Sequence, residues 1–473
     1  MNVIAAYHRL PAPARDAVSS LKGAWLRSWR YGPETEALVE RALERDAWPP
    51  EAWKAWREER LARVLHRAAT RVPFYRKHWE ERRRGGDRRS WERLENWPLL
   101  TKDRLRAAPR AFLADDVDPR RMYRERTSGT TGLPLDLWWS RETVRAWFAI
   151  YEARIRRWNG VDRRDRWAIL GGQPVVHPDA RHPPFWVSNR PMRQLYLSAN
   201  HVSPETAGLF VAELARRRPT HLVGYPSSLA FLAREAARQG LARPASLRVV
   251  VTNAEPLLPG QREAIAEGLC PEVRETYGMA EIAAAGSECP AGALHEWPEV
   301  GWIETWKDDA DVAAEAGEPG RLVCTTLLNR DMPLVRYAVG DRGRAPAAGG
   351  CACGRRLPVF AAIEGRSNDL LIAPDGRRVF WVNPVFYGLP VREAQVVQQA
   401  PDAIRVRVVA APGFGGSARR AIEEGLRLRL GSVRVAVEEC DAIPRGPNGK
   451  FRAVVREFSG GGAPGEPREA ARA

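Results

Sequence analysis

Residues 127–132 read Thr-Ser-Gly-Thr-Thr-Gly, six consecutive small residues of which four carry a hydroxyl group. Such a run cannot build a hydrophobic core, and its glycines let the backbone turn tightly and approach another molecule closely. Backbone N–H groups and hydroxyls together can surround a polyphosphate. The run lacks the Gly-Lys-Ser/Thr ending of the Walker phosphate loop. On its own it is consistent with either a phosphate-binding turn or a plain surface turn.

Downstream of this run, short apolar stretches alternate with amphipathic helical patterns. We expect helix over residues 53–69, 205–217, 227–239 and 260–268, and strand over residues 166–171, 221–224, 247–252 and 273–277. Ser227 is a candidate N-cap. Strands that alternate with helices predict an α/β domain with a largely parallel sheet. The first part of the chain, residues 1–110, is expected to be mainly helical.

The character of the chain changes near residue 365. Short β-rich stretches follow, and one helical pattern at residues 417–430 lies among them. We therefore predict a large α/β domain over residues 1–364 and a small α+β domain over residues 365–458. Residues 459–473 are rich in glycine, proline and charge, and we expect them to be disordered.

The composition narrows the class of protein. The 473 residues are 44% hydrophobic and 28% charged, which is ordinary for a soluble enzyme. No stretch approaches the roughly 18 apolar residues of a membrane helix. The first residues lack the apolar core of a signal peptide, so we expect a cytoplasmic protein. The net charge is +16. Basic residues are not interleaved with aromatic ones as in nucleic-acid-binding modules, so we interpret them as dispersed over solvated faces and expect no nucleic-acid partner.

Three further motifs carry candidate chemistry. Tyr277 and Glu281 follow a predicted strand, where a parallel sheet opens onto a ligand crevice; the ring can stack on a base and the carboxylate can bind Mg²⁺. Asp341, after a glycine, can accept hydrogen bonds from both hydroxyls of a ribose. Lys450, in a loop rich in glycine and proline, can place a point charge beside a phosphate. Taken singly, each is better explained as a capping or solvated surface residue.

Together these motifs resemble the adenylate-forming superfamily of acyl-CoA synthetases, adenylation domains and luciferases. Within it, the chain is most similar to the phenylacetate–CoA ligase group and its capsule-biosynthesis relatives. The resemblance extends from about residue 60 to residue 455, with the motifs in the family's order. The matching segments are residues 72–76, 98–102, 128–134, 224–227, 253–256, 277–281, 333–341, 365–369 and 449–450.

The resemblance implies a large ATP- and acid-binding domain and a mobile C-terminal domain with its hinge at Asn368 and Asp369. It also implies roles for the matching residues. The ATP phosphates would be held by Ser128, Gly129, Thr130, Thr131 and Gly132. The remaining contacts would be adenine packing by Tyr277 with Gly278, ribose binding by Asp341 with Arg366, Mg²⁺ binding by Glu281, and bridging of carboxylate and α-phosphate by Lys450.

The implied activity is ATP-dependent activation of a carboxylic acid to an acyl-adenylate, with release of pyrophosphate. The acyl group then passes to a thiol, for which coenzyme A is the first choice. One alternative is transfer to an amine, a hydroxyl or a carrier protein during polysaccharide or natural-product assembly. Another is a catalytically inactive nucleotide-binding protein. The sequence departs from the family's common pattern at three positions: Leu133, Ala280 and Asn368 stand where the family often has lysine, threonine and aspartate. Because of these departures, the substrate and the rate of family members are not carried over to this chain.

The acid itself would lie among Tyr225, Asn253 and Ala254. The candidates to line the pocket of an aromatic substrate are Trp138, Trp139 and Trp167. Because 18 tryptophans are scattered along the chain, we favour a core position for these three. The helical, tryptophan-rich N-terminus has two interpretations: it forms either a homodimer surface or a cap on the first domain.

The six cysteines are too few for a disulfide framework. Four residues nevertheless form two local pairs next to glycine or proline: Cys289 with His295, and Cys351 with Cys353. A Cys₃His set suits tetrahedral Zn²⁺. Our hypothesis is a closed structural zinc site, and the alternative is four unrelated reduced residues.

Overall fold

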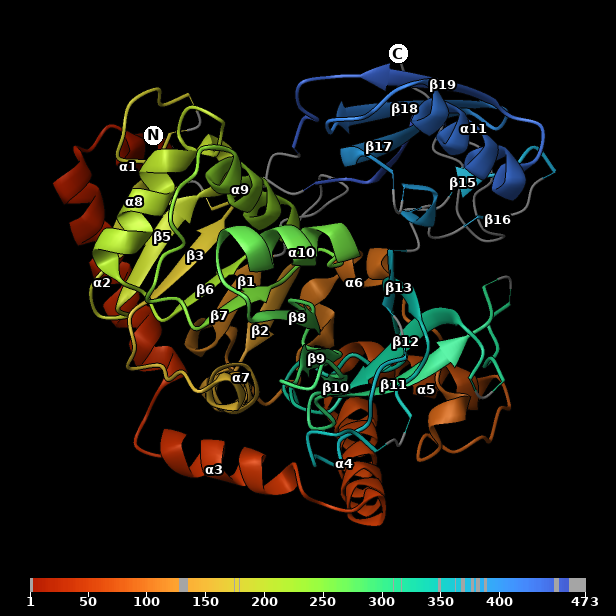
Figure 1. Cartoon of the computed structure of the whole chain (residues 1–473). Helices are drawn as coiled ribbons and strands as arrows, with labels where there is room; N and C mark the ends of the chain where they lie inside the picture. The colour runs from red at the N-terminus through yellow and green to blue at the C-terminus, as the bar shows by residue number, and fades with distance from the viewer. Residues whose placement is uncertain are drawn as a thin grey trace.

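The centre of the large domain is an eight-stranded sheet in the order β10-β9-β8-β7-β6-β3-β5-β4 (Figure 1). The inner strands β5, β3, β6, β7 and β8 run parallel, whereas β4, β9 and β10 pair antiparallel at the two edges. The bounds are β3 Trp167–Gly171, β4 Trp186–Asn189, β5 Gln194–Ser198, β6 His221–Gly224, β7 Val249–Thr252, β8 Val273–Gly278, β9 Ala285–Glu288 and β10 Leu294–Glu296. The fold class predicted from the sequence is confirmed.

The computed structural model describes most of the chain. The described residues are 3–126, 135–173, 175–177, 179–308, 310–315, 317–347, 350–361, 363–366, 371–375, 378–379, 383–386, 389–445 and 451–458. In these ranges no helix is long and apolar enough to cross a membrane.

Both faces of the parallel strands are covered, which is why these strands are runs of apolar residues. Successive side chains of a strand point to opposite faces, so Val250 packs among the helices on one side and Val249 and Val251 pack on the other. The helices of the first face are α8 Ala207–Arg217, α9 Pro226–Arg238 and α10 Pro259–Gly268. On the second face lies α7 Arg141–Tyr151, which continues into a π-helical turn over Glu152–Arg156. Ser227 is not the N-cap of α9: that position is Tyr225, and Pro226 takes the first turn.

The predicted helical N-terminus consists of α1 Val3–His8, α2 Ala12–Arg30, α3 Thr35–Arg45, α4 Pro50–Arg71 and α5 Pro73–Arg84. In α4, residues such as Leu61, Val64 and Leu65 are buried at helical spacing, and the helix ends before Pro73, which cannot continue it. These residues pack against a second sheet rather than against the central one. The short α6, Lys102–Ala107, follows and is capped by the Thr101 side chain.

This second sheet has four antiparallel strands in the order β11-β12-β13-β14. Their bounds are β11 Gly301–Trp306, β12 Gly320–Thr326, β13 Tyr337–Gly343 and β14 Ile363–Arg366. The segment before α6 joins it, because Leu100 forms a parallel bridge with Tyr337. A separate hairpin, β1 Tyr123–Arg126 with β2 Asp136–Trp139, flanks residues 127–134, which lie outside the described residues.

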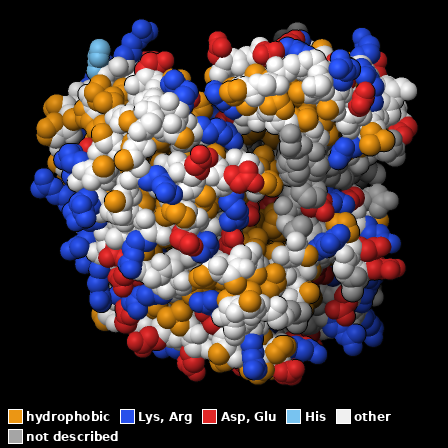
Figure 2. Space-filling model, viewed as in Figure 1, with side chains coloured by type: hydrophobic (Ala, Val, Ile, Leu, Met, Phe, Trp, Pro, Cys, Tyr) orange, Lys and Arg blue, Asp and Glu red, His pale blue; other side chains and the backbone are white. Residues whose placement is uncertain are grey.

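The C-terminal part of the chain forms its own layer of sheet and helix (Figure 1). Four strands are arranged β19-β18-β17-β20, and α11 Gly416–Leu430 packs its buried Ile422, Leu426 and Leu430 on them. The strands are β15 Leu371–Ile372, β16 Arg378–Val379, β17 Val391–Ala400, β18 Ala403–Ala410, β19 Arg434–Glu439 and β20 Val454–Arg456. On the face in Figure 2, Lys and Arg side chains are scattered among acidic and apolar ones rather than gathered in one patch.

A fully buried arginine, Arg154, connects the N-terminal helices to the large domain. Its guanidinium donates to Asp46 at 2.9 Å and to both carboxylate oxygens of Glu299 at 2.7 and 2.9 Å. Asp46 follows α3 and also accepts from the indole of Trp158 at 2.7 Å. Because every strong hydrogen-bonding group is paired, the buried charges are tolerated.

We predict that Gly301→Ala destabilises the fold. A Cβ at Gly301 would collide with the carbonyl of Ala283, where β11 crosses the loop after β8. Overpacking of this kind costs about 1–3 kcal/mol in the free energy of unfolding, measurable by urea denaturation. Gly260→Ala is the control, because a Cβ there meets nothing within 4 Å. Equal stability of the two variants would contradict the packing described for β11.

Candidate functional site

The predicted acid-side residues lie along one edge of the central sheet. The parallel strands β6, β7 and β8 end side by side, and Tyr225, Asn253 and Tyr277 stand at their carboxyl ends. In open α/β sheets this edge is where ligands bind. The backbone N–H of Asn253 donates to the carbonyl of Gly224 at 3.0 Å, so the loops after β6 and β7 are held together.

Two features of the loop after β7 suit a ligand. The side-chain oxygen of Asn253 is buried and has no hydrogen-bond partner among the described residues. A buried acceptor without a hydrogen bond lowers the stability of the fold, and a hydrogen-bond donor on a ligand would satisfy it. The next residue, Ala254, is exposed and adopts a left-handed φ of 64°, a conformation that costs a non-glycine residue energy and is concentrated at functional sites.

Tyr277 connects the central sheet to the second sheet. Its hydroxyl donates to Asp341 of β13 at 2.9 Å, and burial together with the negative charge of Asp341 raises the pKa of Tyr277 well above its ordinary value. Gly278, beside it, is exposed. Arg366 stands directly opposite Asp341 in the β13–β14 register, which brings the backbones of the two predicted ribose-binding residues together.

Glu281 lies three residues beyond β8 and is buried, with 5% of its surface exposed. Its Oε1 accepts from the Tyr337 hydroxyl at 2.9 Å and lies 3.0 Å from Nζ of Lys102. Lys102 begins α6, and the Leu100–Tyr337 bridge places both partners beside Glu281. Lys102 and Tyr337 fall within the matching segments 98–102 and 333–341, but the sequence analysis assigns neither residue a role. The presence of a lysine in a family motif was the available signal.

Glu255 links the large domain to the C-terminal part of the chain. Its carboxylate accepts from the backbone N–H of Ser227 at 3.2 Å and from that of Phe451 at 2.8 Å. Burial raises the pKa of Glu255. Phe451 follows Lys450 directly, so this contact fixes the position of the chain next to the predicted catalytic lysine. The sequence analysis assigned Glu255 no role.

Several predicted residues lie outside the described residues. These are the phosphate-loop residues 128–132 with Leu133, the hinge residues Asn368 and Asp369, and Lys450. Among the described tryptophans, Trp138, Trp139 and Trp167 are buried, as favoured from the sequence. The aromatic side chain that does approach the site is Trp147 of α7: a Cβ on Gly278 would lie 3.9 Å from its ring.

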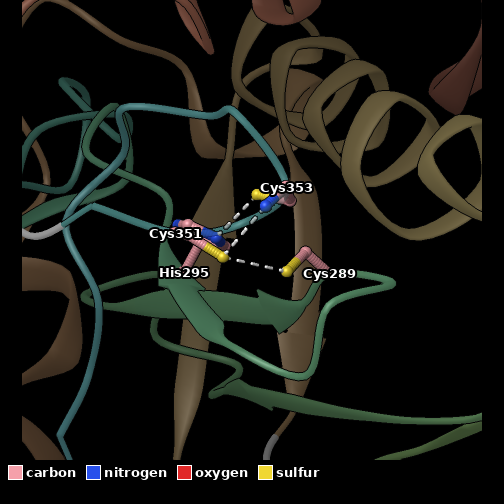
Figure 3. A group of neighbouring side chains, drawn as sticks. All are labelled: Cys289, His295, Cys351 and Cys353. Carbon is pink, nitrogen blue, oxygen red and sulfur yellow. Dashed lines mark hydrogen bonds between the residues drawn. The ribbon is translucent and has the colours of Figure 1, made fainter.

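Figure 3 shows the second predicted constellation, Cys289, His295, Cys351 and Cys353. Cys289 and His295 come from the β9–β10 hairpin, and the two other cysteines come from a loop packed over it. All four ligand atoms lie within 4.8 Å of one another. The sulfurs of Cys289 and Cys351 are 3.7 Å apart, and the Cys353 sulfur is 3.4 Å from Nε2 of His295. The structure therefore brings together the four residues that were paired only locally in the sequence.

The ring of His295 is in the form that a metal ligand needs. Burial lowers the pKa of His295, which keeps the ring neutral, and its Nδ1 is paired with the carbonyl of Leu357 at 3.1 Å. That contact leaves Nε2 facing the sulfurs. Burial raises the pKa of Cys289 to about 11, so this thiol would have to lose its proton to a bound cation before it could act as a ligand. The pKa of Cys353 is lowered, because hydrogen bonds from Arg355, Cys351 and Cys289 together exceed the opposing effect of burial.

The candidate site therefore lies at a parallel sheet edge, beside a second sheet, with Phe451 of the C-terminal part in contact with Glu255. Residues 54–324, more than half of the chain, match the family described as AMP-binding enzyme, and residues 371–457 match the CapK C-terminal domain. The chain therefore belongs to the AMP-binding enzymes of the adenylate-forming superfamily. It is an AMP-forming ligase, a class that activates a carboxylic acid as an acyl-adenylate.

Two curated relatives cover most of the chain. The phenylacetate-coenzyme A ligase of Thermus thermophilus is 29% identical over 363 residues, which is 72% of this chain and 74% of the relative. Protein CapK of Staphylococcus aureus is 24% identical over 379 residues, or 77% of this chain and 80% of the relative.

Solved structures show the same fold. A 2-hydroxyisobutyryl-CoA ligase in the postadenylation state, with R3-HIB-AMP bound, matches with a TM-score of 0.67 and 20% identity over 87% of this chain and 91% of its own. The same enzyme in the thioesterification state, with 2-HIB-AMP and CoA bound, matches with a TM-score of 0.53 and 22% identity over 87% of this chain and 92% of its own.

We predict that Glu255→Ala slows acid-dependent ATP–pyrophosphate exchange. The substitution leaves the N–H groups of Ser227 and Phe451 without their acceptor. An unsatisfied buried donor costs about 1–3 kcal/mol, so loss of the contact with Phe451 alone predicts a decrease of about 10- to 100-fold. Glu255→Gln, which keeps one acceptor oxygen, should retain more activity. Glu263→Ala, an exposed position on α10, is the control. Unchanged exchange in Glu255→Ala would show that the contact with Phe451 does not support adenylation.

Proposed function

We propose that the enzyme joins a carboxylic acid to coenzyme A in two steps. A carboxylate oxygen of the acid attacks the α-phosphorus of ATP, the bond to the β-phosphate breaks, and pyrophosphate leaves. The thiolate of coenzyme A then attacks the acyl carbon, and AMP leaves. The observation that carries the proposal is the meeting of Tyr277 with Asp341 and of Glu281 with Lys102 and Tyr337 at one sheet edge. The curated relatives named phenylacetate-coenzyme A ligase support the acceptor.

The nucleotide would lie between the two sheets. In this proposal Tyr277 packs against adenine, beside the exposed Gly278, while Asp341 and Arg366 bind the ribose. Residues 128–132 hold the phosphates, and Lys450 bridges the two reacting anions. Attack of one anion on another is limited by charge and orientation, so neutralisation and positioning dominate the catalysis.

Magnesium fits the residue that we assign to it. Glu281 offers a buried carboxylate, the kind of ligand that Mg²⁺ takes in combination with nucleotide phosphates and water. When bound, the ion would neutralise phosphate charge. In the described structure Lys102 and Tyr337 fix the orientation of that carboxylate.

The acid would occupy the space lined by Tyr225, Asn253 and Ala254, with Trp147 as an aromatic neighbour. Burial raises the pKa of Tyr225, so this side chain stays a neutral hydroxyl at physiological pH. A ring from Trp147 beside Gly278 favours a flat or aromatic acid over a bulky branched one.

A second acceptor is supported by one observation. The C-terminal residues 371–457 match the CapK C-terminal domain, and Protein CapK covers a larger share of this chain than the phenylacetate-coenzyme A ligases do. The alternative function is therefore an adenylating ligase that delivers the acyl group to an amine, a hydroxyl or a carrier protein. Both functions share the adenylation step and differ only in the second.

We expect acid-dependent ATP–pyrophosphate exchange with at least one member of a panel of aryl, fatty, hydroxy and amino acids. Lys450→Ala should abolish the exchange, because the lysine charge stabilises the transition state of adenylation. Lys54→Ala, at an exposed position on α4, is the matched control. Adding coenzyme A then tests the acceptor: thioester formation supports the first function, and adenylation without thioester supports the alternative. Absence of exchange with every acid, despite ATP binding, would overturn the proposal.

We also propose that Cys289, His295, Cys351 and Cys353 bind a structural Zn²⁺. A tetrahedral ion with Zn–S distances of about 2.3 Å has edges between ligand atoms of about 3.5–3.8 Å. The 3.7 and 3.4 Å separations match such edges, and the sulfurs are too far apart for a disulfide. The neutral His295, oriented by the Leu357 carbonyl, completes the set. The ion would hold the β9–β10 hairpin against the loop that carries Cys351.

Elemental analysis of unchelated protein should find about one zinc per chain, as a closed tetrahedral site binds one ion. Cys351→Ser should lose the metal and lower the melting temperature, and zinc should also dissociate as acid protonates the ligands. Cys440→Ser, a cysteine outside the cluster, is the control. Well under one zinc per chain in the parent protein would refute the site.

A further inference from the structure

A cavity lies between the helices α3, α4 and α7, away from the sheet edge that binds the nucleotide. Its volume is about 310 Å³. In Figure 1 this part of the molecule lies at the end opposite the C-terminal domain. Its apolar walls include Leu38, Ile150 and Leu328, and Trp56 supplies an aromatic surface. Ligand pockets for small molecules begin at about 300 Å³, so the space suffices for a compact organic molecule.

The acidic side chains of the cavity are already neutralised. Glu34 pairs with Arg145, which also lines the cavity. Glu142 pairs with Arg330 at 2.7 Å. Glu299 is held by Arg154 at 2.7 Å, with Arg45 at 3.8 Å. Each of these carboxylates therefore already has an arginine partner.

Two arginines of the cavity remain without a carboxylate. Within the described parts of the chain, Arg41 and Arg60 form no ion pair, and Nε of Arg60 is buried without a hydrogen-bond partner. Arg60 lies over the face of Trp56 at 5.8 Å from the ring centroid, and Arg45 approaches the same ring at 5.3 Å. Burial and the nearby cations Arg330 and Arg63 lower the pKa of Arg60, and the carboxylate of Glu142 opposes them. Four arginines, of which Arg41 is exposed, and three glutamates line the cavity, so the lining has an excess of positive charge beside an aromatic surface.

We propose that this cavity binds a small organic anion, a carboxylate, sulfonate or phosphate ester with a flat apolar body. The guanidinium groups of Arg60 and Arg41 would take the anionic group, since the planar fork of arginine matches such oxyanions. Trp56, Leu38 and Ile150 would cover the apolar body. An anion here would relieve the repulsion among the arginines, so the binding energy comes from charges that the fold leaves unpaired.

The site is separate from the acid pocket but shares a helix with it. Ala146 and Ile150 of α7 face the cavity, whereas Trp147 of the same helix approaches Gly278 and packs on Trp297. A molecule in the cavity thus contacts the side of α7 that faces away from the adenylation site. The proposal goes beyond the ligase reaction and does not depend on which acid is activated.

Isothermal titration of the full chain with naphthalene-1-sulfonate tests the site. We expect saturable 1:1 binding to the parent protein, a loss of at least tenfold in affinity for Arg60→Gln, and no binding to Ala146→Phe, which fills the cavity with its charges intact. Arg63→Gln is the matched control, because Arg63 lies on the same helix but is exposed and paired with Glu59. The uncharged 1-naphthalenemethanol should bind far more weakly than the sulfonate.

Three results would overturn the proposal: no saturable binding to the parent protein, equal affinity in Arg60→Gln and Arg63→Gln, or equal affinity of the two naphthalene compounds. Thermal unfolding of each variant is measured alongside. If Ala146→Phe fails to fold, the comparison of Arg60→Gln with Arg63→Gln decides alone. Binding that survives both Arg60→Gln and a folded Ala146→Phe places the probe elsewhere and refutes the site. Because the readout is binding and not catalysis, failure here is distinct from failure of the ligase proposal.

Discussion

The buried guanidinium of Arg154 is the constraint on which one end of the molecule depends. A charge removed from water costs several kcal/mol, and it persists only when its partners are complete. Asp46 comes from the N-terminal helices and Glu299 from the segment after β10, so one side chain joins parts of the chain about 250 residues apart. The backbone carbonyl of Asp46 accepts from the backbone N–H of Arg356, beside the loop that carries Cys351 and Cys353. The helical N-terminus is therefore part of the large domain's framework.

The same principle applies at the candidate functional site. The central sheet and the second sheet have separate backbone hydrogen-bond networks, and side chains join them across the site. Tyr277 donates to Asp341, while Tyr337 and Lys102 contact Glu281. Each contact pairs an anion with a donor in a partly buried setting, where such interactions are stronger than in water. The relative position of the two sheets thus sets the geometry of the candidate site.

The elements predicted best from the sequence were those that a local residue pattern encodes. The parallel strands could be predicted because burial on both faces makes them continuous apolar runs, such as Val249–Thr252. The second sheet escaped prediction, because β13 contains two glycines and charged residues and shows no clear alternation. At the candidate site, motifs predicted Tyr277, Glu281 and Asp341, and the structure shows Tyr277 bonded to Asp341. Glu255 could not be assigned a role, because its partner Phe451 is 196 residues away and only the folded chain brings the two together.

The parallel bridge between Leu100 and Tyr337 has a consequence for the order in which the chain folds. The sheet that carries Asp341 is joined at this point by a segment more than 200 residues earlier in the chain. During synthesis, the N-terminal helices emerge long before β13, so their apolar faces remain unpacked until the second sheet is complete. Topologies dominated by such distant contacts fold slowly. The large domain therefore cannot complete its core as the ribosome delivers it, and its early helices are the segments most in need of protection from aggregation.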